Sequence, residues 1–211
     1  TNLYTASLVG GELANAEGGQ VTIKDFNGDK GTVKSATVAN NGTMNIEQFT
    51  LTDGAITGTG TLDLGHGNVS SLQTSQVGAQ GSIAQGTLLV KTAKLNSAGT
   101  IDVDNLQTNK GVVTSGTFSA DNVTLGDGFT IEAGHTTFGT VTVDANRDIT
   151  NKGTFDVTGV FTGAQAKLIN NGASAQMNIK GATANLDTIT NTDGTLTVAA
   201  TTTLKTLTNA D

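Results

Sequence analysis

Apolar and polar residues alternate with a period of two along most of the chain. In "GTIDV" (99–103), Ile101 and Val103 fall on one side, whereas Thr100 and Asp102 fall on the other. The same spacing recurs in the pairs Leu62 and Leu64, Val141 and Val143, Phe155 and Val157, and Leu196 and Val198. This pattern predicts short, half-buried strands. No period of 3.6 residues persists for three turns, so we expect very little helix.

A recurring turn separates these strands, in which Asn is followed within a few residues by Gly. The copies include "VANNGTMNI" (38–46), "LNSAGTIDV" (95–103), "DITNKGTFDV" (148–157), "LINNGASAQMNI" (168–179) and "TITNTDGTLTV" (188–198). The asparagines at 151, 170, 191 and 209 are 19, 21 and 18 residues apart. The chain is therefore predicted to repeat a unit of about 20 residues, with a register that is not strict.

A unit of this length, with two or three strands and no crossover helix, favours an all-β solenoid with about 20 residues per coil. Equivalent strands would stack about 4.8 Å apart, and an Asn at the same turn of successive coils could bond to the Asn above and below. We therefore predict a structural ladder of Asn151, Asn170 and Asn191, with Asn171 as the alternative to Asn170. Asn45 is assigned to an outward strand position. Hairpin turns of an antiparallel sandwich remain an alternative reading of Asn-Gly.

Composition narrows the classes of protein. The chain has 28 Gly, no Pro and no Cys, which favours many tight turns and excludes disulfides and cysteine-based zinc sites. Its net charge is −7 with no basic cluster, so nucleic acid is not an expected partner. No apolar run is long enough to cross a bilayer. We expect residues 1–211 to form a single repeat domain that is a fragment of a longer array, with residues 1–20 as an N-terminal coil or cap.

The repeats and the segment "ITGTGTLDLG" (56–65), with the Thr, Asn and Gly bias and the lack of Cys, resemble the passenger domains of Gram-negative autotransporters. They resemble filamentous-haemagglutinin-type exoproteins nearly as well, from about Asn15 onward. The resemblance implies a right-handed parallel β-helix that is secreted or displayed at the bacterial outer membrane. It also implies a structural or adhesive role, with a surface protein, a glycan or a second copy as the partner.

A carbohydrate-active enzyme, either hydrolase or lyase, is the alternative on the same fold. "GHG" (65–67) and "NTD" (191–193) occur in polygalacturonase-like glycosidases, but here their order is reversed and the accompanying Asp pair and Arg-Ile-Lys are missing, so we interpret His66 as a loop residue.

Spacing also weighs against an active site. Asp63, Asp102 and Asp156 are assigned to one outward position two to three coils apart, at roughly 10–15 Å. Glycoside hydrolysis needs carboxyl groups about 5–9.5 Å apart. Asp102 and Asp104, about 6.7 Å apart on one strand face, form the best remaining carboxylate pair. We predict no catalytic residue.

Two further segments suggest a calcium ligand and an ice-binding surface. Asp25, Asn27 and Asp29 in "DFNGDKG" (25–31) have the spacing of the first half of an EF-type calcium loop, but Lys30 replaces the sixth-position Gly and Ala36 the twelfth-position Glu. The prediction is a turn with an acidic rim, and no metal or cofactor. An ice-binding threonine array would need a regular outward position. That position instead runs Asn45, Asp63, Leu89, Asp102, Ser119, Thr142, Asp156, Thr197.

Overall fold

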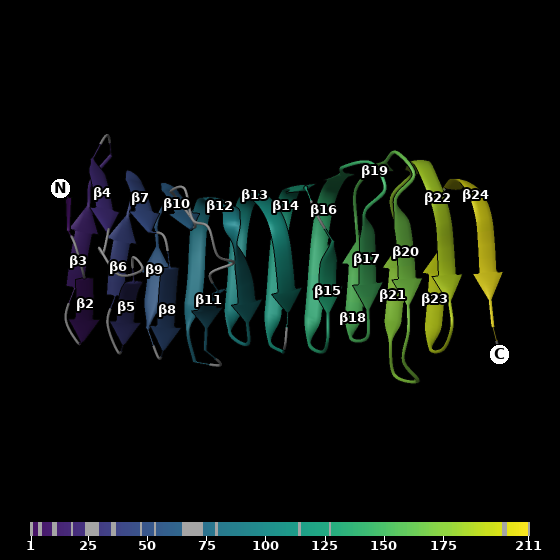
Figure 1. The fold of residues 1–211 in the computed structure, drawn as a ribbon, viewed down its shortest axis with the longest axis horizontal. Coiled ribbons are helices and arrows are strands. Elements are labelled where there is room, and N and C mark those ends of the chain that lie inside the picture. The colour runs from purple at the N-terminus through teal and green to yellow at the C-terminus, as the bar shows by residue number, and fades with distance from the viewer. Residues whose placement is uncertain are drawn as a thin grey trace.

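The computed structural model is an elongated stack of coils in which every described strand pair is parallel (Figure 1). It describes residues 2–3, 6–9, 12–17, 19–23, 30–34, 37–46, 48–52, 54–64, 74–78, 80–113, 115–126, 128–199 and 202–210. These residues contain no helix. The N- and C-termini lie at opposite ends of the stack. The chain is thus an all-β parallel solenoid, and the antiparallel sandwich is wrong.

Each coil has three faces, which we number in chain order. Face 1 contains β1 (Asn2–Leu3), β4 (Gln20–Ile23), β7 (Thr43–Ile46), β10 (Thr61–Leu64) and β19 (Phe161–Gly163). Face 2 contains β2 (Ala6–Val9), β5 (Lys30–Lys34), β8 (Gln48–Thr52), β11 (Thr74–Val77), β15 (Phe129–Ile131), β17 (Asp148–Asn151) and β20 (Lys167–Asn170). Face 3 contains β3 (Glu12–Asn15), β6 (Thr37–Asn40), β9 (Ala55–Thr57), β18 (Thr154–Val157), β21 (Gln176–Ile179) and β23 (Thr195–Val198).

The other strands bend around corners and belong to two or three faces. They are β12 (Ser82–Ser97), β13 (Thr100–Val113), β14 (Thr117–Leu125), β16 (His135–Val143), β22 (Thr183–Asn191) and β24 (Thr202–Asn209). Residues 100–103, 105–108 and 110–113 of β13, for example, pair on faces 3, 1 and 2 in turn. Paired residues on successive coils are about 19 apart, close to the predicted 20.

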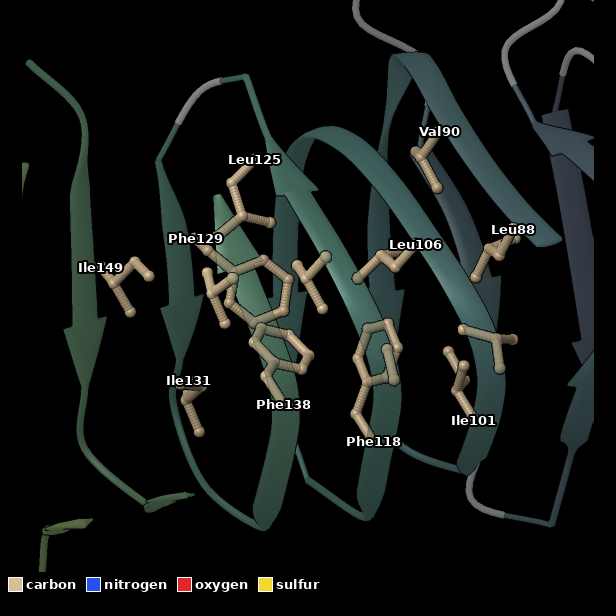
Figure 2. Packing of buried hydrophobic residues seen from close by; sticks show 14 of the residues in the cluster. Leu88, Val90, Ile101, Leu106, Phe118, Leu125, Phe129, Ile131, Phe138 and Ile149 are labelled. Atoms are coloured by element: carbon tan, nitrogen blue, oxygen red, sulfur yellow. The ribbon is translucent and has the colours of Figure 1, made fainter. Parts of the chain in front are cut away.

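The interior is a continuous column of apolar side chains, as the period-two alternation predicts. Although aromatic residues make up only 4% of the chain, the largest fully buried side chains are phenylalanines: Phe118, Phe129, Phe138, Phe155 and Phe161. The ring centroid of Phe138 lies 5.8 Å from that of Phe118 and 5.4 Å from that of Phe129 (Figure 2). It also lies 5.7 Å from the ring centroid of Phe155. Phenylalanine rings in edge-to-face contact therefore fill the middle of the solenoid.

The recurring Asn turn lies at a different corner of the coil in the two halves of the chain. In the N-terminal half, Asn40 ends a face 3 strand and the following Thr43–Ile46 lies on face 1. In the C-terminal half, Asn151 ends a face 2 strand and Thr154–Val157 lies on face 3. The alternation assigns eight outward residues to a single column, but they form two columns on different faces. The face 1 column contains Asn45, Asp63, Leu89 and Thr142, and the face 3 column contains Asp102, Ser119, Asp156 and Thr197. A short alternating strand fits any of the three faces, so alternation alone does not reveal this shift.

Candidate functional site

An amide ladder runs inside the corner between faces 2 and 3. Asn151 Nδ2 donates to Asn170 Oδ1, Asn170 Nδ2 to Asn191 Oδ1, and Asn191 Nδ2 to Asn209 Oδ1, each over 2.7 Å. Asn151 and Asn170 are fully buried, whereas Asn171 is exposed, so Asn170 is the residue that faces inward. Asn170 Nδ2 also donates to the carbonyl oxygen of Thr195 over 3.1 Å. The ladder thus satisfies buried backbone as well as its own amides.

A second ladder, which our sequence reasoning missed, occupies the corner between faces 3 and 1 in the N-terminal half. Asn15 Nδ2 donates to Asn40 Oδ1 over 2.8 Å, and Asn40 Nδ2 donates to Gln85 Oε1 over 2.7 Å. The coil between Asn40 and Gln85 has Gly58 at this corner, with φ of 129°. A Cβ there would lie 2.3 Å from the Asn40 carbonyl oxygen. Since Gly58 contributes no side chain, the extra methylene of Gln85 spans the gap. The repeat copy "VANNGTMNI" (38–46), which contains Asn40, is the sequence feature that could have predicted this second ladder.

Asn45 and Asp63 occupy the outward strand positions that the alternation assigns to them, but neither side chain is exposed. Both are buried, with exposed fractions of only 4%. Asp63 alternates with Leu62 and Leu64, which are themselves fully buried, so this part of β10 is covered on both sides. Asp63 also lies on face 1 and Asp102 on face 3, so the two carboxylates do not share a column.

Asp102 and Asp104 both line an open groove of about 300 Å³ on the outside of the corner between faces 3 and 1. Its other walls are Gly58, Thr59, Ala84, Gln85 and Gly86. The groove lies at a corner where the turn becomes one residue shorter from one coil to the next. Three residues separate Thr57 from Thr61 in the first coil, whereas two separate Ala84 from Thr87 in the following coil. Asp102 accepts a short hydrogen bond from Ser119 Oγ on the next coil. This groove is therefore where the structure brings the predicted carboxylate pair together.

Asp156 is the centre of a polar network on the outer surface of face 3. Its Oδ1 accepts a 2.6 Å hydrogen bond from Asn178, and its Oδ2 lies 3.2 Å from His135 Nε2 and 3.6 Å from Lys180 Nζ. Burial alone raises the pKa of the Asp156 carboxyl. The hydrogen bonds from Asn178 and His135 and the charges of Lys180 and His135 outweigh burial and hold the pKa below its ordinary value.

The same network contains Thr137, His135 and Asp156, but their geometry does not suit a nucleophilic triad. Thr137 Oγ1 lies 3.3 Å from His135 Nε2, which is the nitrogen that also contacts Asp156. In a triad the base uses one ring nitrogen for the nucleophile and the other for the carboxylate. Here one nitrogen serves both groups, so the contacts tie neighbouring coils together and do not activate the hydroxyl.

Four predicted positions lie outside the described residues: His66 and the loop residues Asp25, Asn27 and Asp29. Within the described ranges, no group of three or more His, Asp or Glu side chains is placed to hold a metal ion. The described part of the chain also has no helix that is long and apolar enough to span a membrane.

The class defined by these features is the parallel β-solenoid with internal amide ladders. Comparison of the chain with protein-family models, with curated proteins and with solved structures finds no match.

Proposed function

We propose that the chain is a β-helix segment of a secreted or surface-displayed bacterial passenger protein, with a structural or adhesive role. The observation that carries this proposal is the pair of amide ladders inside an elongated parallel stack. Ladders of this kind fix the corners of the coils from within and leave the outward side chains free for contact. The resemblance of the repeats to autotransporter passengers supports export.

The outer surface also suits adhesion. On face 3 the outward residues include two polar pairs that bond between neighbouring coils: Ser119 donates to Asp102, and Asn178 donates to Asp156. Such bonding orients hydroxyl, amide and carboxylate groups along one side of the rod. A row of oriented donors and acceptors can contact a glycan or a protein surface at several points.

To test the proposal, the chain is displayed on a non-adherent Gram-negative bacterium through a heterologous translocator. Protease protection of the intact cells verifies that the chain is folded there. We expect more adhesion to host-cell monolayers, or faster settling of aggregated cells, than with the translocator alone. Adhesion and settling equal to those of the control, with the chain folded at the surface, would contradict the proposal.

A carbohydrate-active enzyme is the second candidate, because Asp102 and Asp104 share a groove. Purified chain is incubated with a panel of acidic and neutral polysaccharides, and the release of reducing or unsaturated ends is measured. The matched variants are Asp102→Asn and Asp104→Asn, with Asp121→Asn as the control, since Asp121 is exposed on the next coil outside the groove lining. Release that is lost in the first two variants and kept in the third would replace the adhesive role with an enzymatic one.

A further inference from the structure

The turn between β20 and β21 is longer than its neighbours at the same corner. Five residues, 171–175, lie between these two strands, whereas two lie between β17 and β18 and three between β22 and β23. Figure 1 shows this turn extending below the turns on either side of it. Asn171, Ala173 and Ser174 are exposed. The turn begins with the dipeptide Asn171–Gly172, which water can therefore reach.

An Asn that precedes Gly can lose its side-chain amide without an enzyme. The backbone nitrogen of the Gly gives up its proton to water and attacks Cγ of the Asn, and the amide nitrogen leaves as ammonia. Water then opens the resulting cyclic succinimide at either carbonyl carbon, which gives aspartate or isoaspartate. The attack requires the side chain and the backbone nitrogen to reach each other in the right orientation. Gly favours this approach because it has no Cβ.

The structure leaves Asn171–Gly172 free to react. Among the described residues, the Asn171 side chain finds no hydrogen-bond partner and the Gly172 N–H has no acceptor. The bond from Ala175 N–H to the Gly172 carbonyl oxygen lies within the turn and does not tie it to another coil. A Cβ added to Gly172 would meet no atom closer than 3.7 Å beyond its chain neighbours, so the backbone has room to move.

Asn41–Gly42 is the same dipeptide at another corner, but the fold holds it in place. Asn41 Oδ1 accepts a hydrogen bond from Thr59 N–H over 3.1 Å. A Cβ on Gly42 would lie only 2.3 Å from the Gly19 carbonyl oxygen, so Gly42 is packed tightly between coils. Attack on Asn41 Cγ would have to break the bond to Thr59 and displace a backbone that has no free space.

We propose that Asn171 is a site of spontaneous deamidation, which converts it to aspartate or isoaspartate in the folded chain while Asn41 keeps its amide. The product carboxylate extends an existing ion pair, because Glu132, Lys152 and Asn171 directly follow the paired strand ends of three successive coils. Lys152 Nζ already bonds Glu132 Oε2 over 2.8 Å. Asn170 is fully buried and its Nδ2 donates to Asn191 Oδ1, so the inner ladder is not modified.

The reaction is followed by incubating the folded 211-residue chain under mildly alkaline conditions. Samples are digested at acidic pH, the mass of each Asn peptide is measured, and isoaspartate is identified by enzymatic methylation. Loss of amide at Asn171 should be faster than at Asn41 by about tenfold or more. In chain unfolded with urea the two rates should become nearly equal, since both residues precede Gly. Equal rates in the folded chain, or an Asn171 that keeps its amide there, overturn the proposal.

The role of the turn is tested by deleting residues 173–175, which leaves a two-residue turn like that of Lys152–Gly153. At that shorter turn, a Cβ on Gly153 would lie 2.7 Å from the Gly134 carbonyl oxygen, so the deletion should press Gly172 against the coil beneath it. Far-UV spectra and urea unfolding verify that the variant folds. Loss of amide at Asn171 should then slow to a rate near that of Asn41. A folded deletion variant that reacts as fast as the natural chain overturns the inference that the long turn opens the site.

Discussion

At the scale of single residues, Asn170 is the position where the inner ladder can be tested most directly. Replacing it with Ala removes the acceptor of Asn151 and the donors to Asn191 and Thr195. An unpaired buried polar group costs about 1–3 kcal/mol, so we expect Asn170→Ala to lower the free energy of unfolding by more than ~1 kcal/mol in urea titrations.

The neighbouring Asn171→Ala is the matched control, because Asn171 is exposed. It should change the free energy of unfolding by less than about 0.5 kcal/mol. Equal, mild effects at both positions would reduce the asparagines to ordinary turn residues.

Thr136 is a polar residue in an otherwise apolar column. It is fully buried between Phe118 and Phe155 of the adjoining coils, and its Oγ1 has no hydrogen-bond partner in the described structure. A buried hydroxyl without a partner costs about 1–3 kcal/mol. We expect Thr136→Val to raise the free energy of unfolding by ~1 kcal/mol in thermal or urea unfolding, whereas Thr142→Val, at an exposed position, should leave it nearly unchanged. A destabilised Thr136→Val would show that the hydroxyl is satisfied.

At the scale of strands and corners, the reach of Gln85 across Gly58 can be tested by shortening the side chain. Gln85→Asn removes one methylene, so the amide should no longer meet Asn40 Nδ2, now 2.7 Å from Gln85 Oε1. We expect the free energy of unfolding to fall by about 1–3 kcal/mol.

Gln107→Asn, at an exposed position of the next coil, is the control for the same chemical change. Its effect on urea unfolding should stay below about 0.5 kcal/mol. If Gln85→Asn is as mild as this control, the corner can relax to restore the bond.

The network around Asp156 makes a prediction about pH. Because the folded-state pKa of this carboxyl lies below its ordinary value, the stability that it contributes is present above the unfolded-state pKa and is lost as the pH falls through the folded-state pKa. The difference in unfolding free energy between the natural chain and Asp156→Asn should therefore shrink between about pH 5 and pH 2.

Asn178→Ala removes the strongest bond that lowers this pKa, so it should flatten the same pH dependence. Urea unfolding at several pH values measures both. A difference between the natural chain and Asp156→Asn that stays constant with pH would mean that the network does not stabilise the ionised carboxyl.

The sequence predicts the strands, the repeat length and the ladder positions, because side-chain alternation and the Asn turn depend on local sequence. It does not predict on which face a strand lies, since all three faces accept the same alternating segments. Asp63 and Asp102 look equivalent for this reason, yet lie on different faces. The alternation does not predict the role of Gln85, because its partner Asn40 lies two coils away. The groove at Asp102 and Asp104 is not predicted either, because it depends on a difference of one residue in length between two turns.

At the scale of the whole molecule, metal is expected to contribute little to stability. The calcium-like loop at Asp25, Asn27 and Asp29 lacks the sixth-position Gly and the twelfth-position Glu. Excess calcium or a chelator should each shift the melting temperature by no more than about two degrees, since a ligand stabilises only in proportion to its binding. A shift of about ten degrees that disappears in Asp25→Asn would reveal a true site.

The direction of the hydrogen bonds between coils determines how the rod responds to force. Both ladders and all backbone bonds between coils lie along the long axis, so a pull on the two ends of the chain loads one coil boundary at a time. The terminal coil should peel away first, followed by its neighbour, as in unzipping. Each released coil of about 19 residues would add roughly 60 Å of extended chain. Under tension the molecule would then lengthen in repeated small steps and dissipate work at each one.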